Sequence, residues 1–339
     1  SKVIDRAVNN RELYDLFYAA STQRTRMTHG LCVRASNALQ MANALRTFAQ
    51  DGETKDIVTV TRPAKQCRTA FVFSGNGSQW QGMARGLITN PIFRSALDDI
   101  NVLLRPQTGW SVIDELLTEP EFSRLDLTEI AQPTLFAVQV GLVTLLRAHD
   151  VEINAVIGHS VGEIAAAWAA GILDLEAAVH LIHQRSLAQG LTKGQGKMAA
   201  LAIGPAAASE LIAVHGDGIE LAAINSPNSV TLSGESTIID QLAQDCDEKE
   251  IFCRILDLDY AFHSKVMDTV KDVFCDALGP IQPGPGHLPF YSTVTGQRAD
   301  GLSMGTEYWW QNLRAPVVFG QAMENLINDG FNAFVEISP

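Results

Sequence analysis

Short apolar runs alternate with longer segments of helical periodicity in the middle of the chain. The runs at residues 69–73 and 155–157 have the length and composition of buried parallel strands, and a glycine-rich turn follows each of them. Helical patterns lie around residues 91–104 and 134–149, and Pro133 is expected in the first turn of the second helix. This alternation predicts an α/β fold with a mostly parallel sheet.

The pattern changes between residues 197 and 257. Strands and helices are expected there in the order βαββαβ, which is the order of the ferredoxin-like motif. The expected elements are a strand at 198–203, a helix at 205–215, strands at 219–224 and 230–233, a helix at 236–247 and a strand at 251–256. We therefore predict a small subdomain inserted into the larger α/β one, followed by an irregular, proline-rich stretch at residues 280–289.

Residues 1–66 form a separate predicted unit without obvious chemistry. It is expected to contain a helix through Leu13 and Phe17, a strand at 31–33, a helix around 39–45 and a strand at 57–60, with a linker at Arg62-Pro63-Ala64-Lys65. The expected organisation is thus a small αβ linker domain at 1–66, an α/β-hydrolase-like large subdomain at 67–196 and 258–339, and a ferredoxin-like small subdomain at 197–257.

Composition and charge narrow the class of protein. Of the 339 residues, 46% are hydrophobic, which suffices for a sizeable core, and the net charge of −13 argues against a nucleic-acid partner, because phosphate binding requires basic patches. The five cysteines are odd in number and lack CxxC spacing, so we expect reduced, buried thiols and no metal site.

The termini and the hydropathy indicate where such a protein acts. No apolar stretch approaches the roughly 20 residues of a membrane helix. The first six residues do not have the pattern of a signal peptide. We therefore expect a cytoplasmic protein with no membrane partner. The chain ends abruptly at Glu336-Ile337-Ser338-Pro339, after an apolar run, which is typical of a piece of a longer polypeptide.

The strongest local signal for chemistry is Gly158-His159-Ser160-Val161-Gly162. It matches GxSxG after a predicted strand and before an alanine-rich helix, which is the context of a nucleophile elbow. Glycines two residues before and two after the serine relieve crowding in such a turn. The helix that follows offers backbone N–H groups to an oxyanion. The sequence therefore predicts that Ser160 is a nucleophile; a glycine-rich turn with an incidental serine is the alternative.

A serine nucleophile needs a base, and a charged substrate needs a counter-charge. His263 follows the last strand of the predicted small subdomain, which would place it at the cleft between the subdomains. Arg185 lies on the helix after the elbow helix, and a guanidinium can bind a carboxylate through two parallel hydrogen bonds. Spacing alone favours the alternatives, an ordinary surface histidine at 263 and a solvated helix arginine at 185.

Taken together, these segments resemble the malonyl-CoA:acyl carrier protein transacylase family, and in particular the acyltransferase domains of modular type I polyketide synthases. The resemblance covers essentially the whole chain, and residues 1–66 resemble part of the linker between ketosynthase and acyltransferase. The matching segments are Phe73 to Trp80, Gly158 to Glu163, Arg185 with Gln189, Asn225-Ser226-Pro227, Tyr260 to Ser264, Phe290 to Gly296 and Asn312 to Val317.

The resemblance implies a role for each matching residue. Ser160 would be acylated, His263 would be its general base, and Arg185 would hold the free carboxylate of the extender unit. The remaining roles are an oxyanion hole from the backbone N–H groups of Asn76 and Val161, a main-chain carbonyl of Asn312 that orients the histidine, and a site lined by Gln79 and Gln189. Asn76 stands where family members usually have glutamine.

The resemblance also implies substrates and partners. The acyl group would pass from malonyl-CoA to the phosphopantetheine thiol of an acyl carrier protein, with no tightly bound cofactor and with a ketosynthase domain in the same polypeptide. Val161 and Phe262 match the pattern for malonyl, whereas Tyr260 matches the pattern for methylmalonyl. We expect malonyl, because Phe262 would fill the space of an α-methyl group.

Two rival functions share some of these features. A serine hydrolase or thioesterase would have the same elbow, but neutral esters do not require Arg185. A catalytically silent scaffold domain would not require Ser160, His263 and Arg185 together.

Overall fold

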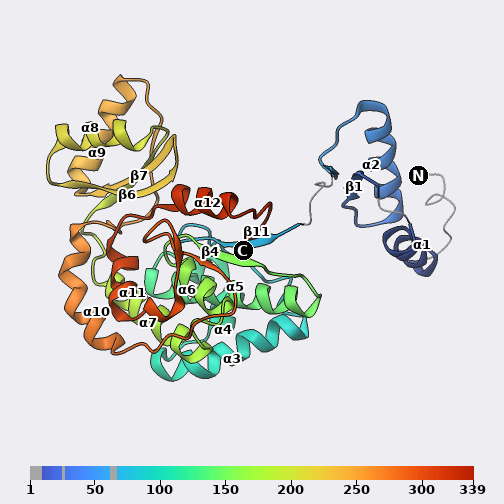
Figure 1. The fold of residues 1–339 in the computed structure, drawn as a ribbon, viewed down its shortest axis with the longest axis horizontal. Coiled ribbons are helices and arrows are strands. Elements are labelled where there is room, and N and C mark those ends of the chain that lie inside the picture. Colours follow the sequence, from blue (N-terminus) through green and yellow to red (C-terminus); the bar gives the residue numbers. More distant parts are fainter. Residues whose placement is uncertain (1–9, 25–26, 62–66) are drawn as a thin grey trace. The chain divides into compact units, whose positions relative to one another are not determined.

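The computed structural model describes residues 10–24, 27–61 and 67–339 of the chain (Figure 1). The chain divides into two compact units, Ser1–Cys67 and Arg68–Pro339. The predicted linker at residues 62–65 lies outside the described residues.

The first unit pairs two helices with a two-stranded antiparallel sheet. Its elements are α1 (Asn10–Thr22), β1 (His29–Val33), α2 (Ala38–Asp51) and β2 (Ile57–Thr61). The side chain of Asn37 caps the start of α2, and Gly52 ends that helix with a φ of 78°, a left-handed conformation that glycine adopts without strain. The predicted helices and strands of this unit are present.

A five-stranded sheet forms the centre of the second unit. Its strands are β3 (Thr69–Phe73), β4 (Ala155–Gly158), β9 (Phe290–Tyr291), β10 (Arg298–Ala299) and β11 (Ala333–Ile337). They lie in the order β10-β9-β4-β3-β11, and all neighbours are parallel except β10, which is antiparallel to β9. The two runs predicted as buried strands are therefore adjacent, and their carboxyl ends lie at the same edge of the sheet.

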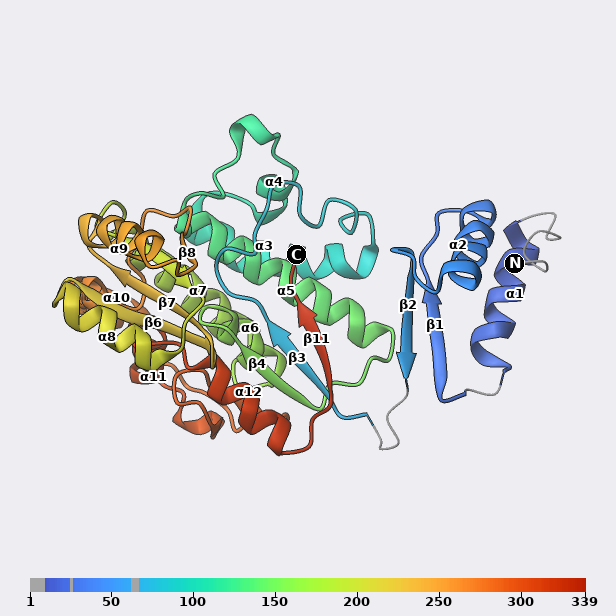
Figure 2. The same cartoon turned by 90° about the horizontal axis from the view of Figure 1, so that it is seen from above.

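Helices cover both faces of this sheet (Figures 1 and 2). The helices of this unit outside the inserted segment are α3 (Pro91–Thr108), α4 (Val112–Leu117), α5 (Thr128–Ala148), α6 (Gly162–Ala169), α7 (Leu175–Gly190), α10 (Lys271–Leu278), α11 (Thr306–Arg314) and α12 (Phe319–Asn328). The main core joins one face of the sheet to α3, α5, α6 and α7, and a smaller apolar cluster joins the other face to α12.

Two expectations about α5 are wrong. The helix begins at Thr128, so Pro133 lies in its second turn. Proline has no N–H, and the one hydrogen bond lost is to the carbonyl oxygen of Glu129, at the very start of the helix. The second wrong expectation is that no apolar stretch approaches the length of a membrane helix. By length and composition α5 would be able to span a membrane, although most of it is buried inside the unit.

The expectation of reduced, buried cysteines is partly wrong as well: the thiols are free, but Cys32 and Cys67 are exposed.

The inserted subdomain has its own sheet and core. Its elements are β5 (Lys197–Leu201), α8 (Pro205–His215), β6 (Ile219–Ser226), β7 (Ser229–Gly234), α9 (Ser236–Glu248) and β8 (Cys253–Ile255). The strands lie in the antiparallel order β6-β7-β5-β8, with α8 and α9 packed on one face (Figure 1). An α/β subdomain with a ferredoxin-like insertion is the predicted fold class, and the structure confirms it.

Candidate active site

Ser160 lies at a sharp turn between β4 and α6. Its φ of 51° is in the left-handed region, which a serine adopts only under strain. The turn leaves no room for side chains on either side: a Cβ on Gly158 would lie 2.3 Å from the backbone nitrogen of Glu163, and a Cβ on Gly162 would lie 2.5 Å from the carbonyl oxygen of Phe73. The strand-turn-helix geometry predicted from GxSxG is therefore present.

His263 contacts Ser160 across 103 residues of sequence. The serine Oγ lies 2.7 Å from Nε2 of the imidazole, and the two residues are 8% and 5% exposed. On the other side of the ring, Nδ1 lies 2.8 Å from the carbonyl oxygen of Ala315. Because a carbonyl only accepts, Nδ1 carries the proton and Nε2 is free to accept the serine hydroxyl proton.

The expectation that the main-chain carbonyl of Asn312 orients this ring is wrong. Asn312 lies inside α11, where carbonyls point along the helix axis, whereas Ala315 follows the end of the helix and is extended. Asn312 acts instead through its side chain. Its Nδ2 donates to the carbonyl oxygen of Ser160 at 3.1 Å and to the carboxylate of Glu163 at 2.9 Å.

Arg185 is a fully enclosed cation beside the serine. It is 2% exposed, and its Nη2 lies 3.1 Å from Ser160 Oγ. Nη1 donates to Gln132 Oε1 at 2.6 Å and to Gln189 Oε1 at 2.8 Å, and Nε donates to Asn312 Oδ1 at 3.3 Å. Over the described ranges of the chain these partners are all neutral, so the guanidinium has no carboxylate in direct contact.

Burial shifts the pKa values of the charged groups at this site. Desolvation lowers the pKa of Arg185 to about 9, and the negative field of Glu163 opposes that shift. Desolvation, helped by the neighbouring Arg185 cation, lowers the pKa of His263 to about 3. The imidazole is therefore neutral at physiological pH, which is the state a general base requires.

Two loops at the carboxyl edge of the sheet carry the N–H groups predicted for an oxyanion hole. Val161 follows Ser160 directly and caps α6, and Asn76 lies in the loop after β3. These loops touch, because a Cβ on Gly75 would lie 2.8 Å from the carbonyl oxygen of His159. Gln79 bends back within its own loop, where its Oε1 accepts from Gly77 N–H at 2.8 Å.

The residues predicted to select the extender unit are packed against the main core. Tyr260 and Phe262 are 2% and 5% exposed, and their rings stack with centroids 4.8 Å apart and an interplanar angle of 15°. Val161, 4% exposed, belongs to the same apolar cluster. Phe262 is therefore a bulky, tightly packed side chain, and it directly precedes His263 in the sequence.

Comparison with known proteins gives a family for this arrangement. The acyl transferase domain family matches residues 70–339. The chain belongs to this family. It is 38% identical over 321 residues to erythronolide synthase EryA2 of Saccharopolyspora erythraea, a match that covers 94% of this chain and 9% of that protein.

Solved structures of acyltransferase domains share both sequence and fold with this one. The acyltransferase domain from module 8 of the salinomycin polyketide synthase is 34% identical, with a TM-score of 0.92 over 99% of this chain and 80% of that one. A loading acyltransferase from the avermectin modular polyketide synthase is 35% identical, with a TM-score of 0.77 over 80% of this chain and 87% of that one.

The structure adds two residues to the acyltransferase site that the sequence analysis missed. Gln132 on α5 accepts from Arg185 and donates to Gln189 at 2.7 Å. Glu163 is fully buried and accepts from Thr293, Tyr308 and Asn312. Desolvation raises the pKa of Glu163 to about 7, against the effect of these donors. The signal that could have found both is a polar or charged residue in an otherwise apolar helix.

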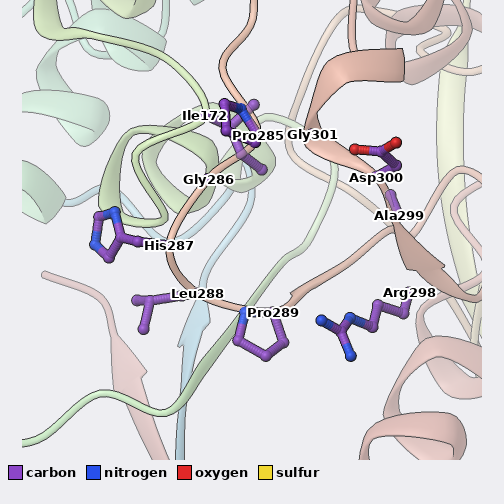
Figure 3. Close-up of a pocket in the computed structure, with 10 residues that line it drawn as sticks. All are labelled: Ile172, Pro285, Gly286, His287, Leu288, Pro289, Arg298, Ala299, Asp300 and Gly301. Carbon is purple, nitrogen blue, oxygen red and sulfur yellow. The ribbon is translucent and has the colours of Figure 1, made fainter.

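A separate surface pocket of the acyltransferase domain has a volume of about 430 Å³ (Figure 3). It is lined by Ile172, Pro285, Gly286, His287, Leu288, Pro289, Arg298, Ala299, Asp300 and Gly301. Arg298 and Asp300 lie on one side of it, and His287 lies on the other (Figure 3). Ser160, His263 and Arg185 do not line this pocket, so it is distinct from the candidate active site.

Proposed function

We propose that this acyltransferase domain transfers a malonyl group from coenzyme A to the phosphopantetheine thiol of an acyl carrier protein, through an ester on Ser160. The observation that carries the proposal is the environment of Arg185. A buried guanidinium that faces the nucleophile and has only neutral hydrogen-bond partners supplies the counter-charge for an anionic substrate. Malonyl thioesters carry such a charge at the end opposite the reacting carbonyl.

In the first half-reaction Ser160 attacks the thioester carbonyl. His263 Nε2 takes the hydroxyl proton as the new C–O bond forms, and the carbonyl oxygen of Ala315 stabilises the resulting imidazolium through Nδ1–H. The backbone N–H groups of Val161 and Asn76 would hold the oxyanion, each contributing about 3 kcal/mol to its stabilisation. The C–S bond then breaks, and the departing coenzyme A thiolate takes the proton from the imidazolium.

The second half-reaction reverses these roles. The carrier-protein thiol gives its proton to His263 and attacks the acyl-serine, and Ser160 leaves and recovers that proton. Water competes with the thiol at this stage. Arg185, by holding the malonyl carboxylate, keeps the ester carbonyl fixed in the geometry that the thiol requires.

The direct test is incubation of the protein with malonyl-CoA, followed by intact mass measurement and proteolytic mapping. We expect the mass of one malonyl group, attached to the peptide that contains Ser160. No added mass, or malonyl on a different residue, contradicts the proposal.

The pH profile tests the state of the base. Because the pKa of His263 is lowered to about 3, protonation should not remove the base until strongly acidic pH. In the Glu163→Gln variant, where residue 163 no longer titrates, kcat/KM for acylation should therefore stay flat between pH 8 and pH 5. Glu163 titrates near pH 7, so the Glu163→Gln variant is measured in parallel. A fall in kcat/KM with a midpoint near the ordinary histidine pKa of about 6.5, persisting in Glu163→Gln, would contradict this assignment.

The packing of Phe262 supports malonyl as the extender unit. The ring is fixed by its stack on Tyr260, so it cannot move aside readily for an α-methyl group. We expect Phe262→Ser to shift the preference towards methylmalonyl-CoA by about 10-fold, since one methyl group is worth about 1–3 kcal/mol of discrimination. The measurement is competition between the two thioesters, read by intact mass. Phe252→Ser, at an exposed position, is the matched control.

The acceptor and the setting of the domain belong to the same proposal. The curated relatives are much longer than this chain, which covers 9% of erythronolide synthase EryA2. We infer a carrier protein as acceptor, a ketosynthase domain in the same polypeptide and a cytoplasmic location. A serine hydrolase is not favoured, because the chain belongs to the acyl transferase family.

A further inference from the structure

The backbone at His263 is strained and must be held in place. Its φ of 59° lies in the left-handed region, which a non-glycine residue adopts only where its surroundings enforce it. The position of the imidazole also depends on a second segment, because Nδ1 donates to the carbonyl oxygen of Ala315. The geometry of the base is therefore set by two stretches of chain, one around residue 263 and one around residue 315.

Glu220 of the small subdomain binds both of these stretches. It lies on β6, and its Oε1 accepts from the backbone N–H of Lys265 at 3.0 Å, two residues beyond His263. Its Oε2 accepts from Arg314 Nη1 at 2.9 Å, one residue before Ala315. A single carboxylate thus links the segment that carries the base to the segment that orients it.

Backbone pairing places Glu220 at this junction. β6 is an edge strand of the small sheet and lies beside α12 (Figure 1). Val317 N–H donates to the carbonyl oxygen of Ala222 at 2.9 Å, and Ile224 N–H donates to the carbonyl oxygen of Val317 at 2.8 Å. The strand that carries Glu220 is therefore joined directly to the chain that follows Ala315.

Arg314 binds a second carboxylate, that of Asp268, which can be compared with Glu220. Asp268, in the 3-10 helix η3 (Lys265–Val270), accepts from Arg314 Nε at 2.8 Å. The Asp268 side chain is 56% exposed and the Glu220 side chain 31% exposed, so the contact with Asp268 is the more screened of the two. Within the described residues, the Asp268 carboxylate accepts no hydrogen bond from the backbone N–H of Lys265, which donates to Glu220 instead.

We propose that Glu220 is a positioning residue that holds His263 in line with Ser160, and that the small subdomain acts on catalysis through it. The inference rests on the proposed function, in which His263 is the general base. Among the described residues, Glu220 is hydrogen-bonded neither to Arg185 nor to the side chains that bind Arg185. Its loss should therefore slow proton transfer without weakening substrate binding.

The test compares Glu220→Ala with Asp268→Ala in the acylation of the whole protein by malonyl-CoA. We expect Glu220→Ala to lower kcat about 10-fold with little change in KM, because a small displacement of the base is costly. Asp268→Ala, which leaves the contact with Lys265 intact, should stay within about twofold of the wild type. The rate at which phenylmethylsulfonyl fluoride modifies Ser160 should fall in parallel with kcat in Glu220→Ala, since it depends on the same base.

The results distinguish failure of the role inferred for Glu220 from failure of the proposed function. A kcat for Glu220→Ala within about twofold of the wild type, an equal loss in Asp268→Ala, or a change confined to KM would overturn the inference. If Glu220→Ala does not fold, Glu220→Gln decides, because its amide oxygen can still accept from Lys265 while its NH₂ cannot bind Arg314; a wild-type kcat there overturns the inference. Absence of acylation in the wild type would instead overturn the proposed function.

Discussion

Replacement of His263 by alanine is expected to lower the rate of Ser160 acylation about 1,000-fold, since a positioned general base contributes about 10²–10⁴. The hydroxyl would lose the acceptor that now lies 2.7 Å away, and Arg185, its other contact, can only donate. The measurement is the single-turnover rate of acylation by malonyl-CoA, read by quenched mass analysis.

Two control variants are measured beside His263→Ala. Ser160→Ala should show no acylation and gives the baseline. His149→Ala removes an exposed histidine at the end of α5 and should leave the rate unchanged. A rate for His263→Ala within tenfold of the wild type would show that another group accepts the proton.

Replacement of Arg185 by alanine is expected to lower kcat/KM for malonyl-CoA by about 10²–10³, because a substrate carboxylate left unpaired in a buried site costs about 2–5 kcal/mol. The partners that remain, Gln132, Gln189 and Asn312, now present acceptor oxygens to the guanidinium. Their carbonyl oxygens would repel the carboxylate rather than bind it.

The substrate dependence of the Arg185→Ala effect is what identifies the role of the guanidinium. Acylation by acetyl-CoA, which lacks the carboxylate, should fall much less than acylation by malonyl-CoA. Arg94→Ala removes an exposed arginine whose ion pair lies within one helix, and it serves as the control. Equal losses for malonyl-CoA and acetyl-CoA would mean that Arg185 supports the structure of the site rather than the charge of the substrate.

Local pattern in the sequence was enough to predict the elbow and the order of the elements. The glycines around Ser160 are required by contacts within the turn itself and with the neighbouring strand, so a short motif specifies them. The βαββαβ order of the small subdomain follows from the spacing of apolar residues in each element. In α5 the same reasoning misplaced the start of the helix, because Pro133 is tolerated in the second turn.

Only the tertiary structure decided which groups meet at the site. His263 reaches Ser160 because the small subdomain is inserted in the chain between β4 and β9, and the chain returns to the carboxyl edge of the large sheet at residue 263. Ala315 rather than Asn312 orients the ring because of where α11 ends. The neutral surroundings of Arg185 depend on the packing of α5, α7 and α11, and the environment of Glu163 on α6 depends on α11. The spacing of apolar residues predicts each helix or strand. The distances between helices and strands depend on how they pack against one another, and no local sequence pattern contains that information.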